Sequence, residues 1–258
     1  MRLRIAFSPC PNDLFIFYKF ISEESLGWDV KLLEMENLNK LAMDGGIDVV
    51  KISAGIYPIV KDRYEILRVG SAFGIKDGPI VVAKRPMDPK NVKVLATPGV
   101  TTTAHLVYRK LFGEPEKVVT MEYNEIIPAI LDEKVEAGIL IHEGRLLYRN
   151  YGLYMIADLL SLWHNLYPEK LPLPLGLIVI KKELGKLKEK VEEIILESLN
   201  FAKNNYEKVL DFIAKKHPHL SKTQIEEYIN NFVNEYTYSL DHKATKALSI
   251  LLGETIDI

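Results

Sequence analysis

Residues 136–152 read EAGILIHEGRLLYRNYG, and this stretch contains the transition around which the predicted fold is organised. The apolar run 137–141 has the character of a buried strand, and the segment after His142 and Glu143 carries apolar residues at helical spacing. His142 therefore lies at a predicted strand-to-helix junction. In a parallel α/β sheet such junctions lie at the carboxyl ends of the strands, where ligands bind. Histidine exchanges protons near neutral pH, so His142 is a candidate acid–base residue, and a histidine that only caps the helix is the alternative.

The alternation of apolar runs with amphipathic segments continues on both sides of this stretch. Predicted strands at 3–7, 28–33, 48–52, 92–96 and 117–121 are each followed by a segment with helical periodicity. Further strands are predicted at 65–69 and 79–83, and the chain beyond residue 181 is helical by pattern. This alternation predicts a mostly parallel sheet with helices on its faces.

Proline-rich connections next to apolar strands, at 84–91 and 171–180, predict two crossings between lobes. We expect lobe 1 to begin with residues 1–84, lobe 2 to comprise residues 85–172, and residues 173–258 to return to lobe 1 as a strand and C-terminal helices. Such a chain resembles the α/β, two-lobed, type II periplasmic-binding-protein-like fold, with a helical C-terminal tail. Its two crossing segments would form a hinge, which in this architecture closes the lobes around a ligand.

The composition is that of a soluble globular protein, with 48% hydrophobic and 26% charged residues and a net charge of -2 over 258 residues. It contains no long basic run, which disfavours binding to nucleic acid or to an anionic membrane, and no apolar run long enough to span a bilayer. The amino terminus lacks the features of a secretory signal, and the single cysteine, Cys10, fits a reducing compartment. We expect a cytoplasmic protein whose partner is a small molecule. The abundance of Lys and Glu indicates a thermophilic source.

Four junctions, at 8–13, 51–53, 97–103 and 142–143, each follow a predicted strand and begin a helix. Two fall in each lobe, so a single cleft between the lobes could gather all four. Hydroxyls and backbone N–H groups at Ser53 and Thr101–Thr103 could bind a carboxylate or phosphate there. The alternative is that these residues are ordinary helix caps, which is a common role for serine and threonine.

Other candidate residues have a stronger structural interpretation. Cys10 lacks an evident partner base and is more simply a small buried residue. Trp163 could lie against a flat ring, although a tryptophan in the core is the more common case. Only His217 and His219 approach the spacing of metal ligands, and no nucleotide-binding motif is present. We therefore expect no metal and no cofactor.

The segments SPCPNDLFIFY, KISAGIY, PGVTTTAH, AGILIHEGRLLYRNYGL and LPLPLG occur in this order along the chain. With them the chain resembles the 1,4-dihydroxy-6-naphthoate synthase family, lyases of the futalosine route to menaquinone. The resemblance covers roughly residues 3–180 and weakens in the helical tail. SPCPND and the combination of IHE, Arg and YGL are its most specific motifs.

The resemblance implies a monomer or homodimer that holds cyclic dehypoxanthine futalosine, a small carboxylate, between its two lobes. It implies His142 as the general base. Ser53, Thr102 and Thr103 match hydroxyl-bearing positions of the family and are expected to hold the carboxylate or hydroxyls of the substrate. Asn12 is expected to face the same cleft.

Two departures from the family pattern concern the substrate. Leu14 stands where family members commonly have threonine, and Ala54 and Gly55 stand where bulkier residues are usual. Two other functions therefore stay open. One is a non-catalytic protein that binds a small acid, and the other is a related lyase or dehydratase that acts on a chorismate-like acid.

Overall fold

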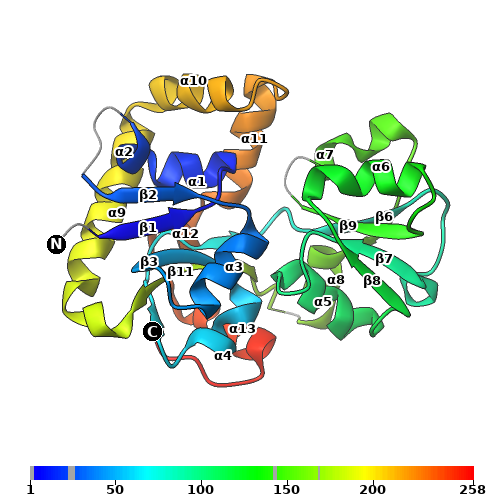
Figure 1. Cartoon of the computed structure of the whole chain (residues 1–258), viewed down its shortest axis with the longest axis horizontal. Coiled ribbons are helices and arrows are strands. Elements are labelled where there is room, and N and C mark those ends of the chain that lie inside the picture. The colour runs from blue at the N-terminus through cyan, green and yellow to red at the C-terminus, as the bar shows by residue number, and fades with distance from the viewer. Residues whose placement is uncertain (1–2, 23–26, 142–143, 168) are drawn as a thin grey trace. The chain divides into compact units, whose positions relative to one another are not determined.

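The structure, a computed structural model, describes residues 3–22, 27–141, 144–167 and 169–258. The chain forms two compact units, each built from one sheet and its helices (Figure 1). Unit 1 comprises Met1–Phe73 and Pro174–Ile258, and unit 2 comprises Gly74–Leu173. The chain thus leaves unit 1 within β5 (Ala72–Gly74) and returns at the start of β11 (Leu173–Lys181). The α/β class expected from the sequence is confirmed.

The sheet of unit 1 has the strand order β2-β1-β3-β11-β4, and β5 also pairs with β11. Strands β1 (Arg4–Phe7), β2 (Asp29–Leu32) and β3 (Val49–Ser53) are parallel. Strand β11 runs antiparallel to β3 and to β4 (Tyr64–Ile66), because the chain re-enters the unit from the opposite direction. The three parallel strands correspond to the first three predicted strands.

Helices cover both faces of this sheet (Figure 1). One face carries α1 (Pro11–Ile16), α2 (Tyr18–Ile21), α9 (Lys188–Asn204), α10 (Tyr206–Lys216) and α11 (Lys222–Phe232). The other face carries α3 (Met35–Met43), α4 (Tyr57–Val60) and α13 (His242–Leu252), and α12 (Glu235–Tyr238) follows α11. The helical tail therefore packs on the first part of the chain.

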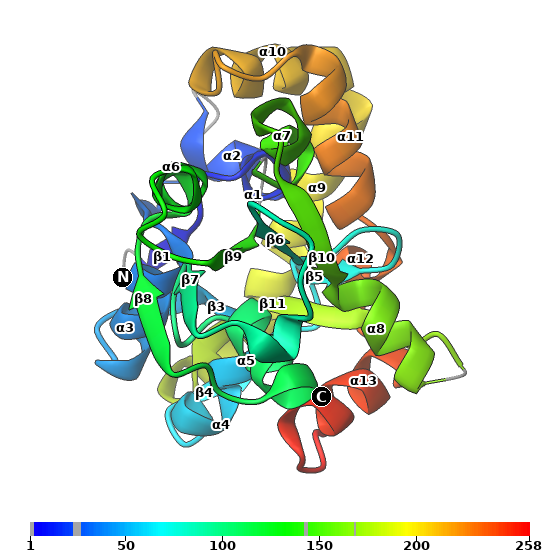
Figure 2. The same ribbon diagram turned by 90° about the vertical axis from the view of Figure 1, so that its right-hand side faces the viewer.

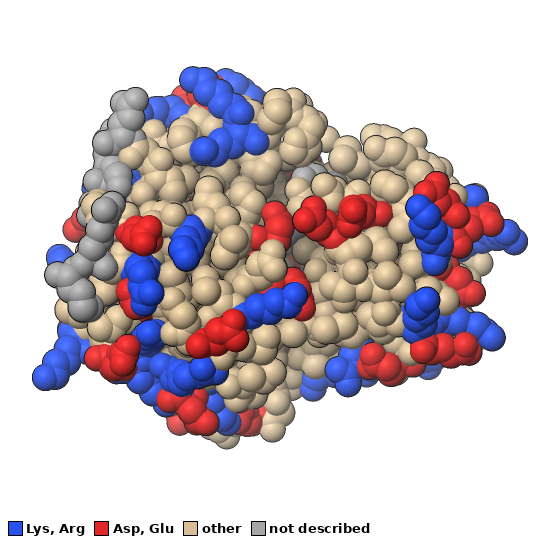
Figure 3. Space-filling view, in the orientation of Figure 1, with Lys and Arg blue, Asp and Glu red and all other residues tan. Residues whose placement is uncertain are grey.

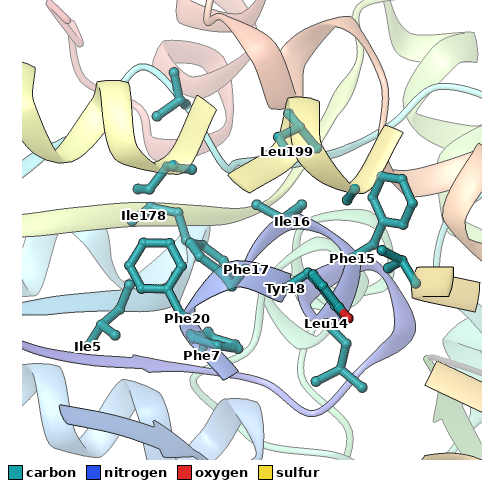
Figure 4. Packing of buried hydrophobic residues seen from close by; sticks show 14 of the residues in the cluster. Ile5, Phe7, Leu14, Phe15, Ile16, Phe17, Tyr18, Phe20, Ile178 and Leu199 are labelled. Atoms are coloured by element: carbon teal, nitrogen blue, oxygen red, sulfur yellow. The ribbon is translucent and has the colours of Figure 1, made fainter. Parts of the chain in front are cut away.

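The core of unit 1 explains why the short helix α1 is stable. All six of its residues are buried, and its neighbours in space come from β1, β11 and α9 (Figure 4). Phe7 and Phe17 stack with their ring centroids 4.4 Å apart. An isolated helix of this length would not form in water, so burial of its apolar side chains holds α1 in place.

The sheet of unit 2 has the order β10-β6-β9-β7-β8. Strands β7 (Val94–Thr97), β8 (Lys117–Thr120) and β9 (Ala137–Leu140) are parallel, whereas β6 (Ile80–Ala83) is antiparallel to both β9 and β10 (Tyr154–Asp158). Helices α6 (Ile126–Leu131) and α7 (Gly144–Leu147) lie on one side of this sheet. Helices α5 (Thr103–Phe112) and α8 (Leu159–Leu166) lie on the other side (Figure 2).

The first boundary between the units differs from the one expected at residue 84. That boundary places β6 in lobe 1, whereas β6 is hydrogen-bonded to β9 and β10 of unit 2. The proline-rich segment after β6 contains the 3-10 helix Pro89–Asn91 and connects two strands of the same sheet. Prolines mark where regular structure is interrupted, and they do not show which sheet the preceding strand joins.

The surface of the described residues is mixed in charge. On the face shown in Figure 3, Lys and Arg are interspersed with Asp and Glu, which is typical of a solvated surface. None of the helices in the described ranges is long and apolar enough to span a membrane.

Candidate functional site

In unit 1, two of the predicted junctions lie side by side. Strands β1 and β3 are parallel neighbours, with Ile5 opposite Val49 and Ala6 opposite Val50. The segment after β1 and the end of β3 therefore meet at the carboxyl end of the sheet, where α/β proteins bind ligands. We call residues 8–13, 39 and 51–53 the unit 1 site.

Asp13 is the centre of hydrogen bonding in this site, and it is fully buried. Its Oδ2 accepts hydrogen bonds from Ser8 N at 3.1 Å and from Ser8 Oγ at 2.5 Å. Its Oδ1 accepts one from Asn12 Nδ2 at 3.1 Å and forms an ion pair with Lys51 Nζ. The side chain of Lys51 is only 5% exposed. A buried carboxylate is stable only when such partners replace water.

This ion pair was not predicted from the sequence. Asp13 and Lys51 belong to two of the predicted junctions, but they lie 38 positions apart. Their residue types are among those most often found at the surface, and nothing in their spacing indicates that they pair. The available signal was a lysine within an otherwise apolar strand, because such a lysine needs a buried partner.

Asn12 is in the unit 1 site, as expected, and is 4% exposed. It is the second residue of α1, directly after the proline that begins the helix. Proline is well suited to this position, since its missing N–H would have no acceptor within the helix. The side-chain nitrogen of Asn12 is bonded to Asp13, and this bond fixes the orientation of the amide group.

Ser53 is also in the unit 1 site, but its setting differs from the expected helix start. It is the last residue of β3 and precedes a 3-10 helix of three residues, Ala54–Ile56. The side chain of Asn39 on α3 contacts it twice: Ser53 N donates to Asn39 Oδ1 at 2.8 Å, and Asn39 Nδ2 donates to Ser53 Oγ at 3.0 Å. The backbone N–H of Ser53 is thus already bonded, and its hydroxyl can donate its own proton elsewhere.

Asn39 was missed by sequence reasoning although it is fully buried. It lies between Leu38 and Ala42 on the buried side of α3. An asparagine within the apolar stripe of a helix requires hydrogen-bond partners, and this pattern could have identified it.

Cys10 of the unit 1 site is buried and forms no disulfide. It packs against Tyr228 and Phe232 of α11. Burial raises the pKa of its thiol well above the usual value, and the nearby Asp13 carboxylate acts in the same direction. Because the thiolate is the nucleophilic form, this environment favours the interpretation of Cys10 as a packed side chain.

In unit 2, the loop after β7 forms the second part of the predicted site. Thr102 is the N-cap of α5: its Oγ1 accepts a hydrogen bond from His105 N at 3.3 Å and donates one to Gly99 O at 2.7 Å. Thr103 is the first residue of α5, and both threonines are buried. We call residues 97–105 the unit 2 site. The helix therefore begins at the last residue of the junction predicted at 97–103.

His142 and Glu143 lie outside the described residues. Strand β9, which precedes them, ends at Leu140 and is the parallel neighbour of β7. The chain therefore leaves β9 at the same end of the sheet as the unit 2 site. Beyond this point, Arg145 of α7 forms an ion pair with Asp77, which ties α7 to the segment between β5 and β6.

Trp163 is a core residue, which agrees with the more common of the two interpretations. It is 3% exposed, and its indole Nε1 donates to Leu171 O at 3.0 Å. Its neighbour His164 has a pKa below the usual histidine value, because burial disfavours the charged ring and Lys170 adds repulsion.

A cavity of about 370 Å³ lies elsewhere in unit 1. Lys181 donates its N–H to Asp48 O, which places this cavity near the amino end of β3. Charged side chains dominate its lining, which consists of Asp44, Gly45, Asp62, Arg63, Lys181, Lys182 and Glu183. Ligands in this class of fold bind at the opposite, carboxyl end. Within the described ranges, no cluster of three or more His, Cys, Asp or Glu could hold a metal ion.

Known proteins similar to this chain match it over almost its full length. A protein from Thermus thermophilus named 1,4-dihydroxy-6-naphthoate synthase is 34% identical over 98% of this chain and 93% of its own. A protein of the same name from Streptomyces coelicolor is 32% identical over 97% of this chain and 91% of its own.

Solved structures agree with the fold described above. A crystal structure of a protein from Archaeoglobus fulgidus has 34% identity and a TM-score of 0.91, covering 98% of this chain and 96% of its own. The periplasmic aliphatic sulphonate binding protein from Escherichia coli has 10% identity and a TM-score of 0.63, covering 98% of this chain and 85% of its own. This second likeness confirms the periplasmic-binding-protein-like fold.

The family model described as menaquinone biosynthesis matches residues 3–255. The match includes every segment of the unit 1 site and the unit 2 site. The protein therefore belongs to the menaquinone biosynthesis family.

Proposed function

We propose that the protein is a carbon–carbon lyase that converts cyclic dehypoxanthine futalosine to 1,4-dihydroxy-6-naphthoate in menaquinone biosynthesis. The observation that carries the proposal is the family match over residues 3–255, together with two relatives of that synthase name at 34% and 32% identity. Both relatives are covered over more than nine tenths of their own length. The likeness therefore concerns the whole protein rather than one shared module.

His142 is the proposed general base. It removes a proton from the bound cyclic substrate, the sugar-derived fragment leaves as a carbon–carbon bond breaks, and the remaining ring becomes aromatic. Aromatisation supplies much of the driving force. A positioned base of this kind typically contributes about 10² to 10⁴ in rate.

Asn12 and Ser53 of the unit 1 site and Thr102 and Thr103 of the unit 2 site are the proposed substrate-binding residues. The hydroxyl of Ser53 can donate its proton because it already accepts one from Asn39. The first turn of α5 at Thr103 has the partial positive charge of a helix N-terminus, which favours a carboxylate. The charge of Lys51 is balanced by Asp13, so neutral donors would carry most of the recognition.

A non-catalytic protein that binds a small acid is the second candidate. The fold is compatible with this function, because a sulphonate-binding protein has a similar fold, with a TM-score of 0.63. The two functions differ in outcome: a binding protein returns its ligand unchanged, whereas the lyase releases a naphthoate.

The test is to incubate the purified protein with cyclic dehypoxanthine futalosine and to detect the naphthoate by mass. His142→Ala and His142→Asn should abolish turnover while folding and substrate binding persist. His242→Ala, which changes an exposed histidine at the start of α13, is the matched control and should retain wild-type turnover. Unchanged turnover in either His142 variant would exclude His142 as the base. Binding of the compound without product would favour the binding protein.

A further inference from the structure

Two full charges are buried at the carboxyl end of the unit 1 sheet. The side chains of Asp13 and Lys51 are 0% and 5% exposed. Removing such charges from water costs several kcal/mol per ion, and replacement of a buried ion pair by apolar residues is often neutral or stabilising. Stability alone is therefore a weak reason for this pair, and its geometry suggests a second role.

That geometry constrains Asn12. An ionised carboxylate only accepts hydrogen bonds, so Asp13 selects the amide nitrogen of Asn12 and not its oxygen, at a distance of 3.1 Å. With its nitrogen engaged in this way, the Asn12 amide keeps its oxygen as its acceptor group. Ser8 donates twice to the other carboxylate oxygen of Asp13, which holds that carboxylate in place.

Lys51 fixes Asp13 from the neighbouring strand, and the chain makes room for it. Gly176 of β11 lies beside the end of the Lys51 side chain. A Cβ at Gly176 would lie 2.9 Å from Lys51 Cε and 3.8 Å from Lys51 Nζ. Any side chain at this position would displace the ammonium group. Three separate segments, from α1, β3 and β11, thus converge on one arrangement of charges.

We propose that the Asp13–Lys51 ion pair is a positioning device for substrate binding, which holds the nitrogen of the Asn12 amide inward and offers its oxygen to a hydroxyl of the substrate. The proposal rests on the proposed function, which supplies a hydroxylated substrate. Asp13 and Lys51 are positioning residues in this scheme, and Asn12 makes the contact.

The first test removes both charges together with Asp13→Asn and Lys51→Met. The new amide at position 13 keeps one acceptor for Ser8 and turns its NH₂ group toward Asn12, so the Asn12 amide must reverse. KM should rise about tenfold, which is the effect of one lost hydrogen bond. The value of kcat should stay within about twofold of wild type, because the lost contact holds the bound substrate and the transition state equally.

The control removes another ion pair of unit 1, one that joins β1 to the segment just before β3. Arg4 on β1 pairs with Asp48, just before β3, at 2.7 Å and at the amino end of the sheet. The double variant Arg4→Met with Asp48→Asn should keep the KM of wild type. A KM increase in this control equal to that of the Asp13 and Lys51 variant would overturn the positioning role.

The sharpest test is whether the change in KM caused by Asn12→Asp has opposite directions in two backgrounds. In wild type, Asn12→Asp places a carboxylate against Asp13 and should raise KM at least about tenfold. In the Asp13→Asn, Lys51→Met background, the carboxylate introduced at position 12 accepts a hydrogen bond from the amide NH₂ introduced at position 13. Its other oxygen is again available to the substrate, so Asn12→Asp should lower KM in this background. The same direction of change in both backgrounds would refute the proposal.

Gly176→Ala covers the case in which the double variant does not fold. It removes no charge and displaces only the flexible end of Lys51, so the protein should fold and KM should rise several-fold. Wild-type KM in a folded Gly176→Ala protein would count against the proposal.

A measurement without substrate separates this inference from the proposed function. The side-chain NH₂ of Asn12 should be protected from hydrogen exchange by NMR in wild type and in the Arg4, Asp48 control, and unprotected after Asp13→Asn with Lys51→Met. If wild type does not turn over the substrate, the proposed function fails, and the exchange comparison still decides the orientation of Asn12. Equal exchange in all three proteins overturns the inference alone.

Discussion

Replacement of Asn39 by leucine tests how the unit 1 site is held together. Asn39 is fully buried, and its side chain accepts from Ser53 N at 2.8 Å and donates to Ser53 Oγ at 3.0 Å. Leucine has a similar size but can make neither bond. Asn39→Leu therefore leaves the buried N–H and hydroxyl of Ser53 without these partners.

The magnitude follows from these two contacts. Each hydrogen bond contributes about 1 kcal/mol net, and a buried N–H left without an acceptor costs about 1–3 kcal/mol more. Leucine recovers part of this loss by burying apolar surface. We expect Asn39→Leu to lower the free energy of unfolding by roughly 2–4 kcal/mol. We also expect KM to rise, because the Ser53 hydroxyl is no longer held with its proton directed away from α3.

The assay is urea unfolding followed by circular dichroism at neutral pH, with KM measured on the same preparations. Asn37→Leu is the control, since Asn37 is exposed on the same helix and surface substitutions usually change stability by less than about 0.5 kcal/mol. A loss in Asn39→Leu of less than about 1 kcal/mol, or one equal to that of Asn37→Leu, would show that Asn39 does not support Ser53.

Two further predictions concern the two sheets. Gly138→Ala should destabilise unit 2 by about 1–3 kcal/mol or more, because a Cβ there would lie 2.3 Å from Ile126 Cγ2. Thermal unfolding measures this loss. Gly144→Ala is the control and should destabilise the protein less, because its Cβ would make only ordinary contacts at 3.7 Å or more. The Arg4 guanidinium holds the pKa of Asp48 below its usual value, so the stability contributed by Asp48 is complete above its unfolded pKa of about 3.9 and is lost as the pH falls through its folded pKa. The free energy of unfolding of Asp48→Asn should therefore fall less steeply with decreasing pH than that of wild type. Equal slopes of the two proteins in the acid range would contradict this.

The alternation of strands and helices could be predicted because it depends on local periodicity. The apolar runs that became β1, β3, β7 and β9 are followed by turn residues and amphipathic segments, and each formed close to its predicted range. A helix cap was one of the two roles predicted for the threonines after Pro98 and Gly99, and Thr102 is the N-cap of α5. The family was also recognisable from short motifs along the chain, and the match over residues 3–255 confirms it.

Pairing between distant segments could not be predicted in this way. The sheet to which β6 belongs depends on its hydrogen bonds with β9 and β10, and no local pattern specifies these partners. The antiparallel direction of β11 follows from its return into unit 1. Both strands were predicted, and β11 was expected to return to lobe 1, but the unit that β6 joins and the partners and direction of β11 were not predicted.

The candidate site shows the same division. The sequence by itself determined that Asn12, Ser53, Thr102 and Thr103 end strands or begin helices, because the chemistry of turns and caps acts over a few residues. Only the tertiary structure decided that Asp13 pairs with Lys51 and that Asn39 holds Ser53. Those contacts join residues that become neighbours only when β1 and β3 pair and α3 packs on the sheet, since a buried polar group takes its partner from whatever the fold places beside it.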